Sequence, residues 1–189
     1  MKQGSPALSV AILFGASYLA YAQGPPVNHD AQITANFENR VRRYVKIHQE
    51  AEGRLKLPAL KPTANPAKIH GFERSLGQAI RTARRNTKQH EIFTPVISAE
   101  FRRLIGMAFD GSEAHRVRVS LKHDEPVNAR LHVNESYPEA MPLQTTPPSL
   151  LLNLPKLPPE LEYRVVGREL VLRDVKANLV VDFIPNALP

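Results

Sequence analysis

The spacing of apolar residues changes once along this chain, and the change predicts two kinds of structure. Between residues 30 and 110, apolar residues recur at steps of three and four, which is the period of an amphipathic helix. From residue 111 onward, apolar and polar residues alternate, which is the period of a half-buried strand. We therefore expect an α+β fold in which three N-terminal amphipathic helices (30–110) pack on a small antiparallel sheet (111–189) within one domain.

Each expected helix has a recognisable beginning. Asp30 is the expected N-cap of the first helix, which ends near Gly53. Asn65-Pro66 and Thr94-Pro95 each offer a capping side chain followed by a first-turn proline, so they begin the second and third helices. The second helix is expected to fade at 87–89, and the third, with the broadest apolar face, is expected to lie centrally. The stripe that the first helix would bury comprises Ile33, Phe37, Val41, Tyr44, His48 and Ala51.

Up to five strands are expected in the β region, in two groups. They are 116–122 and 127–133, which would form a hairpin, and 162–166, 169–174 and 179–184, which would form a meander. Between the groups, the segment from Pro138 to Pro159 contains seven prolines in 22 residues. We expect it to wrap the domain as an extended strap, with one short helical turn at 146–152.

The first 22 residues have the pattern of a cleaved export signal. Lys2 precedes an apolar run from Ala7 to Tyr21, and Ala20-Tyr21-Ala22 matches an A-x-A cleavage site. The run is shorter than the roughly 20 apolar residues of a membrane-spanning helix, so we expect no transmembrane segment in the mature chain. Residues 23–29 would form a short leader, and the absence of cysteine excludes disulfides and lipid attachment. The expected location is the bacterial periplasm or the extracellular space.

Positive charge is concentrated in the helical region. Residues 40–103 carry fifteen Lys and Arg against five Asp and Glu, whereas residues 104–189 carry nine against eleven. Two clusters of cations could hold lipid headgroups or cell-wall polymers, although a solvated polar face is the alternative interpretation. Nucleic acid is not an expected partner, because aromatic residues for base stacking are nearly absent among these cations. The candidate anion-binding residues are Arg42, Arg43 and Lys46 on the first helix, in a cluster that also contains Arg40, and Arg81, Arg84, Arg85 and Lys88 on the second.

No pattern in the chain indicates a catalytic group, a cofactor site or a metal centre. None of the seven histidines stands at the i,i+2, i,i+3 or i,i+4 spacing that two ligands on one element need. His123 and Asp124 could meet His115 and His132 if the first two strands pair, although solvated or strand-flanking histidines are the favoured interpretation. The chain has no G-x-S-x-G elbow, no cysteine nucleophile and no phosphate-binding loop.

The end of the chain resembles a known family of periplasmic proteins. Pro158-Pro159 is followed by LEYRVVGRELVLRD at 161–174 and LVVD at 179–182. This pattern is similar to the C-terminal strands of the RcnB-type small periplasmic proteins, which are associated with nickel and cobalt homeostasis, and the whole chain resembles exported bacterial proteins with the same ending. The resemblance covers 158–184, lacks the family's tryptophan and has Ala177-Asn178 in place of Thr-Gly. It implies a β-hairpin and a periplasmic setting, and no site residue is carried over from it.

These patterns together predict an exported binding module rather than an enzyme. Its basic helical face would engage an anionic envelope component or a partner protein. The first alternative is a metal-responsive periplasmic protein of the nickel and cobalt type, which rests on the resemblance and on the seven histidines. The second is a hydrolase whose site matches no recognised motif. No catalytic residue, metal ligand or cofactor is assigned from the sequence.

Overall fold

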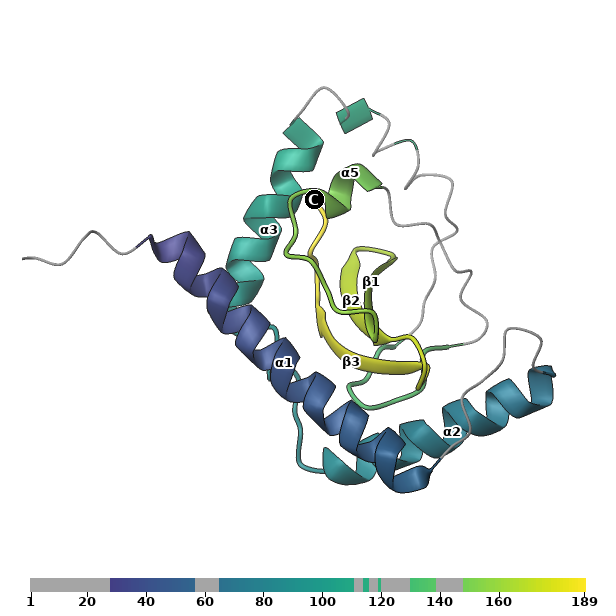
Figure 1. Cartoon of the computed structure of the whole chain (residues 1–189). Helices are drawn as coiled ribbons and strands as arrows, with labels where there is room; N and C mark the ends of the chain where they lie inside the picture. The colour runs from purple at the N-terminus through teal and green to yellow at the C-terminus, as the bar shows by residue number, and fades with distance from the viewer. Residues whose placement is uncertain (1–27, 57–64, 111–113, 116–118, 120–129, 139–147) are drawn as a thin grey trace, which may run out of the picture.

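The computed structural model describes residues 28–56, 65–110, 114–115, 119, 130–138 and 148–189 (Figure 1). This part of the chain is α+β, with the helices first and the sheet last, as predicted. The helices are α1 (His29–Leu55), α2 (Pro66–Ala83), α3 (Pro95–Asp110) and the single turn α5 (Pro148–Leu151). The strands β1 (Leu161–Val166), β2 (Glu169–Asp174) and β3 (Leu179–Ile184) form one antiparallel sheet in the order β1-β2-β3. Among the described residues, no helix is both long enough and apolar enough to span a membrane.

The first two helices begin at asparagine caps. The Asn28 carboxamide oxygen accepts hydrogen bonds from the backbone amides of Asp30 (3.1 Å) and Ala31 (3.3 Å). The cap is therefore Asn28 and not Asp30, which lies in the first turn, where the helix dipole favours a carboxylate. At α2, Asn65 Oδ1 accepts the Ala67 amide at 2.8 Å, which confirms the predicted start.

Two helix ends differ from the prediction. Helix α1 continues through Gly53, and Lys56 closes it in the left-handed conformation (φ 45°). Helix α2 ends at Ala83, before the expected 87–89, because Arg84 leaves helical geometry (φ −109°) and its side chain is buried. Periodicity cannot locate that end, because the cause is a tertiary contact of the residue that follows the helix.

The predicted C-terminal meander is confirmed. Strands β1 and β2 are joined by Gly167-Arg168, and Gly167 has a φ of +57°, a conformation that glycine adopts without steric cost. Residues 175–178 join β2 to β3, and Asn178 closes this turn with a φ of 46°. The pairing of β2 with β3 shifts register between Leu172 and Arg173.

The hairpin expected at 116–122 and 127–133 is not seen among the described residues. Only Val119 of the first expected strand is described, and its backbone is helical. Residues 130–133 of the second are described and form no strand. The described sheet therefore consists of the meander alone. Residues 139–147 of the expected strap lie outside the described residues, while α5 provides the helical turn predicted within it.

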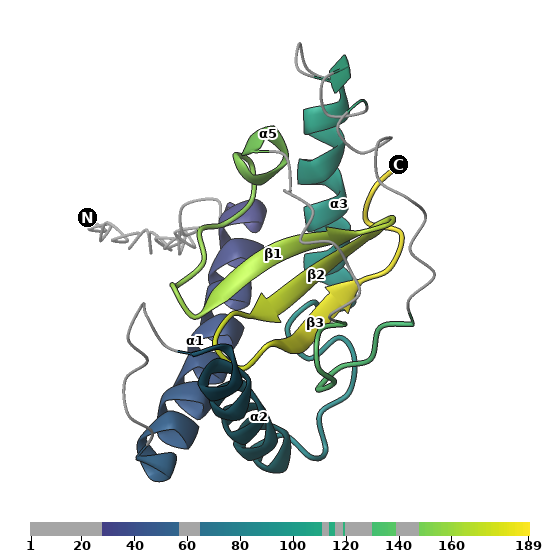
Figure 2. The ribbon, with the colours of Figure 1, turned by 90° about the vertical axis from the view of Figure 1, so that its right-hand side faces the viewer.

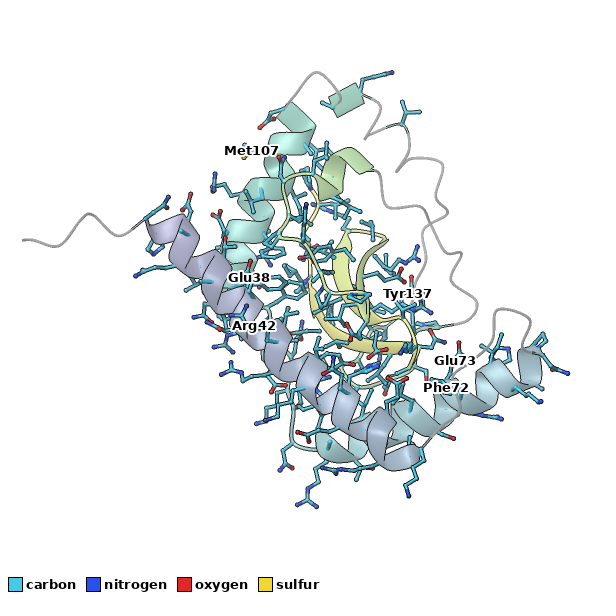
Figure 3. All side chains as sticks on the ribbon, viewed as in Figure 1. Glu38, Arg42, Phe72, Glu73, Met107 and Tyr137 are labelled. Carbon is cyan, nitrogen blue, oxygen red and sulfur yellow. The ribbon has the colours of Figure 1, made fainter. Side chains whose placement is uncertain are left out.

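The segment 130–138 lies along the edge of β3 and bonds to it without forming a strand of the described sheet. The Asn134 amide donates to the Val180 carbonyl, and the Val180 amide donates to the Glu135 carbonyl, both at 2.8 Å. Figure 3 shows Tyr137 on the side of the sheet away from α1, and Leu131 is buried in the same apolar cluster as Tyr137. The alternation of Leu131, His132 and Val133 thus reflects burial against the sheet in the part of the segment that the structure describes.

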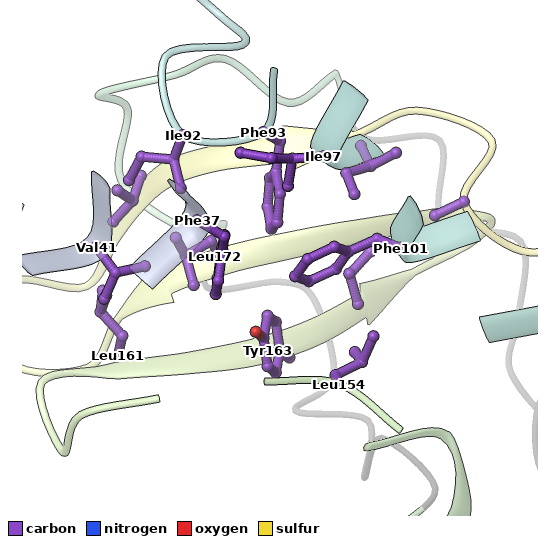
Figure 4. Packing of buried hydrophobic residues seen from close by; sticks show 14 of the residues in the cluster. Phe37, Val41, Ile92, Phe93, Ile97, Phe101, Leu154, Leu161, Tyr163 and Leu172 are labelled. Carbon is purple, nitrogen blue, oxygen red and sulfur yellow. The ribbon is translucent and has the colours of Figure 1, made fainter. Parts of the chain in front are cut away.

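Aromatic rings form the core between the helices and the sheet (Figure 4). The centroid of the Phe101 ring lies 4.8 Å from Phe37, 5.2 Å from Phe93 and 6.1 Å from Tyr163 of β1. Such pairs add about 0.5–1.5 kcal/mol each beyond the burial of their area. They hold α1 and α3 on the same face of the sheet, and Figure 2 shows the strands in front of both helices.

Helix α1, and not α3, is central among the helices. It packs against both α2 and α3, because its buried stripe runs from Ile33 to Ala51. Helix α2 also approaches the β2–β3 turn closely: a Cβ on Gly77 would lie 3.1 Å from the Ala177 carbonyl oxygen. The C-terminal half of α1, the end of α2 and the β2–β3 turn are therefore brought together.

Candidate anion-binding site

A buried carboxylate fastens the connection between α2 and α3 to the sheet. Asp182 of β3 has no exposed surface, and its Oδ2 accepts the backbone amides of Ile92 (2.8 Å) and Phe93 (2.9 Å). Its Oδ1 accepts the amides of His90 (3.2 Å) and Phe183 (2.9 Å). Four N–H donors replace the water that a carboxylate loses on burial. The connection is thereby fixed in position relative to β3.

Arg84, the first residue after α2, is held in place by the same region. Only 3% of its surface is exposed. Its guanidinium donates to Asn134 Oδ1 (2.6 Å), to Glu91 Oε2 (3.2 Å) and to the Val181 carbonyl (3.1 Å). The guanidinium carbon also lies 4.9 Å from the centroid of the Tyr44 ring, within cation–π range. Arg84 is therefore a cation whose position is fixed before any ligand arrives.

A pocket of about 220 Å³ lies between α1 and the α2–α3 connection. Its charged lining residues are Arg40, Arg43, Arg84 and Glu91, so three cations and one carboxylate border it. Arg40 donates to the Glu91 carbonyl and, at 2.8 Å, to Asn36 Oδ1. The exposed Arg43 makes no hydrogen bond or ion pair within the described residues and is available to a ligand. We call this cavity the anion pocket, because guanidinium groups match the planar oxygens of carboxylates and phosphates.

The structure does not gather the seven predicted cations on one face. Positions 42 and 43 differ by about 100° around the helix, which separates Arg42 from Arg43. Arg42 lies next to Glu38 along α1, with an ion-pair distance of 3.7 Å (Figure 3). Arg40, which belongs to the first-helix cluster but not to the candidate residues assigned from it, also lines the anion pocket, because it stands three residues before Arg43. Of the seven, Arg43 and Arg84 line the anion pocket, and Arg84 also lines an adjoining hollow of about 690 Å³ together with Arg85 and Lys88. Arg42 and Lys46 line a separate groove of about 560 Å³. The Arg81 guanidinium lies 3.5 Å from Ser136 Oγ.

A second polar cluster, which we call the His48 cluster, was missed by the sequence analysis. His48 Nδ1 lies 2.5 Å from Asp174 Oδ2, and the Tyr44 hydroxyl donates to the same oxygen at 2.7 Å. On the other side of the ring, His48 Nε2 is 3.5 Å from Glu52 Oε2, and Lys176 Nζ lies 3.0 Å from Glu52 Oε1. The sequence does contain one indication of this cluster: Tyr44 and His48, two polar rings, stand four residues apart in an otherwise apolar stripe.

The His48 cluster changes the proton affinities of its members. Burial by itself lowers the pKa of His48, but its hydrogen bond to Asp174 and the charges of Asp174 and Glu52 outweigh burial and raise that pKa above 6.5. The charge of Lys176 acts in the opposite direction. Burial, followed by the charge of Asp174, raises the pKa of Tyr44 well above its ordinary value, so the hydroxyl remains a donor. The two neighbouring carboxylates thus stabilise the protonated form of the His48 imidazole more than water does.

The His48 cluster is a structural junction and not an open catalytic centre. His48 and Asp174 are both 0% exposed, so a substrate cannot reach either ring or carboxylate. Asp174 Oδ1 also accepts the Ala177 amide at 2.8 Å, which shapes the β2–β3 turn. The cluster therefore joins the C-terminal half of α1 to that turn.

The described residues do not test the metal grouping expected from the sequence. Among them, no three His, Asp or Glu side chains are placed to hold a metal ion. His115 and His132 are described and exposed, while His123 and Asp124 lie outside the described residues.

No protein-family model, no curated protein and no solved structure matches this chain significantly. The resemblance to the RcnB-type proteins therefore stays a prediction.

Proposed function

We propose that this chain is an exported, non-enzymatic binding module that holds an anionic group of an envelope component in the anion pocket. The observation that carries the proposal is the convergence of Arg40, Arg43 and Arg84 on one small cavity. An exported location is supported by the signal pattern and the A-x-A site before Gln23. A partner protein that presents a carboxylate or phosphate would use the same pocket, and the small anions of the test below probe the chemistry that the two kinds of ligand share.

Preorganisation of the pocket favours binding. Arg84 is already desolvated and held by three hydrogen bonds, so little of its side-chain freedom remains to be lost when an anion binds. Arg43 is exposed and supplies the charge that has no partner within the described residues. An anion in the pocket would therefore contact the adaptable Arg43 guanidinium beside the fixed charge of the buried Arg84.

Replacing Arg43 with glutamate should lower the affinity for pyrophosphate by at least about tenfold, because one charge-assisted hydrogen bond is lost and a repelling carboxylate is gained. Isothermal titration calorimetry on the mature protein, repeated with inorganic phosphate, measures the effect. Arg74→Glu makes the same charge change at an exposed position of α2 and should leave the affinity within about twofold. Equal losses in the two variants, or no heat with the unmodified protein, would remove the proposal.

Export has its own test. When the chain is expressed in a bacterium with its native N-terminus, mass spectrometry of the envelope fraction should find a protein that begins at Gln23, because cleavage after Ala22 is expected. Ala22→Arg should block cleavage by placing a large cation at the site. An unprocessed chain in the cytoplasm would contradict the proposed location.

The two alternative functions rest on the sequence alone. A metal-responsive function is supported by the C-terminal resemblance and the seven histidines, and calorimetry with nickel, cobalt and zinc tests it directly. A hydrolase function is supported by no geometry among the described residues, where the buried His48 and Asp174 cannot touch a substrate.

A further inference from the structure

The cations of α1 continue beyond the anion pocket and form a path around the exposed side of the helix. Arg40 and Arg43 stand three residues apart, Arg43 and Lys46 stand three apart, and Lys46 and Arg42 stand four apart. Residues at these spacings are neighbours on a helix surface, with about 5–6 Å between their Cβ atoms. Each cation of the path therefore lies next to another one.

The far end of this path lies in a second depression. The groove of about 560 Å³ runs between α1 and the segment that leads into β1, and its cations are Arg42, Lys46 and Lys156. Glu38, already 3.7 Å from Arg42, is the acidic residue in its lining. We call the set Arg40, Arg43, Lys46, Arg42 and Lys156 the basic band.

We propose that the ligand is a linear polyanion that occupies the anion pocket with one charged group and follows the basic band to Lys156 with others. This inference rests on the proposed function and names the ligand class for the same site. Its basis is the continuity between two cation-lined depressions on opposite sides of one helix. A ligand with a single anionic group would fill only the pocket.

The charges of the basic band are largely uncompensated. Within the described residues, Arg43, Lys46 and Lys156 form no ion pair and no side-chain hydrogen bond. Like charges three or four residues apart destabilise a helix, so α1 carries repulsion that a bound polyanion would relieve. Binding should accordingly raise the melting temperature of the protein.

The surroundings of the band favour a polymer without bases over a nucleic acid. Nonspecific recognition of single-stranded nucleic acid relies on exposed aromatic rings on which bases stack. The two aromatic side chains of α1, Phe37 and Tyr44, are 0% and 2% exposed, and Arg84 covers the Tyr44 ring. The basic band therefore provides positive charge but no exposed aromatic ring on which a base could stack.

The test compares pyrophosphate, tripolyphosphate and long-chain polyphosphate by calorimetry on the mature protein. The long chain should bind at least about tenfold more tightly per molecule than pyrophosphate, because several linked contacts act together. Its affinity should also fall more steeply with salt concentration. Lys156→Glu should reduce long-chain affinity several-fold and leave pyrophosphate affinity unchanged, since Lys156 does not line the anion pocket. Lys68→Glu, at an exposed position of α2, is the matched control and should change neither affinity.

The outcomes separate the two proposals. If pyrophosphate binds but chain length and Lys156→Glu have no effect, the polyanion inference is wrong while the anion pocket stands. If no phosphate compound binds, both fail. If an oligothymidylate of matched charge binds more tightly than polyphosphate, the ligand class is a nucleic acid and the inference is overturned.

Discussion

Replacing Asp182 with alanine is expected to lower the free energy of unfolding by about 3–5 kcal/mol. The substitution removes the shared acceptor of the His90, Ile92 and Phe93 amides, which the core then leaves without partners. Leaving several such donors unpaired costs more than the loss of packing alone. Urea denaturation followed by circular dichroism measures the difference.

A graded series makes the Asp182 result specific. Asp182→Asn keeps one oxygen acceptor and should cost less than alanine. Asp110→Ala removes an exposed acid at the end of α3 and should change stability by no more than about 0.5 kcal/mol. A loss below about 1 kcal/mol for Asp182→Ala would show that the α2–α3 connection does not depend on this carboxylate.

Stability is expected to fall as the pH rises above 6.5, because the His48 cluster then loses a proton. The folded-state pKa of His48 is raised above the ordinary 6.5 of the unfolded chain. Its stabilising contribution is therefore fully present below pH 6.5 and is lost as the pH passes through the folded-state pKa. Between the two pKa values the free energy of unfolding should fall by up to about 1.4 kcal/mol per pH unit. Urea denaturation at about pH 5, pH 7 and pH 9 tests the direction.

Variants of the cluster identify the group responsible. His48→Gln keeps an amide donor near Asp174 but cannot titrate, so the fall in stability above pH 6.5 should become shallower. Asp174→Ala should cost about 3–5 kcal/mol, because it leaves His48 and the Tyr44 hydroxyl buried without an acceptor. A pH profile of His48→Gln that parallels the unmodified protein would assign the effect to another residue.

The strongly periodic parts of the chain were predictable from sequence. The three helices follow from apolar residues spaced three and four positions apart. The final meander follows from the alternation of apolar and polar residues. The expected hairpin is not seen among the described residues, where Leu131 packs against the sheet without belonging to a strand. The spacing of apolar residues in a sequence indicates which side chains are buried. It does not indicate which other element packs against them.

The candidate site was predictable only in part, for a related reason. Helical spacing shows that Arg43 and Arg40 share one side of α1, but not that Arg84 approaches that side. Arg84 looks like a surface cation in the sequence and is 3% exposed in the structure. Its burial depends on contacts with Asn134 and Val181, about 50 and 97 positions away, which no local pattern encodes.

The order of elements along the chain has a consequence for its biosynthesis. The helices precede the meander, and the apolar faces of α1 and α3 are buried against strands that the ribosome makes later. Until Leu161–Ile184 has been synthesised, these helices have no sheet to cover, so the early part of the chain stays without its core. A chain whose strands are made last therefore exposes the apolar faces of its helices during synthesis, when chaperones can bind them.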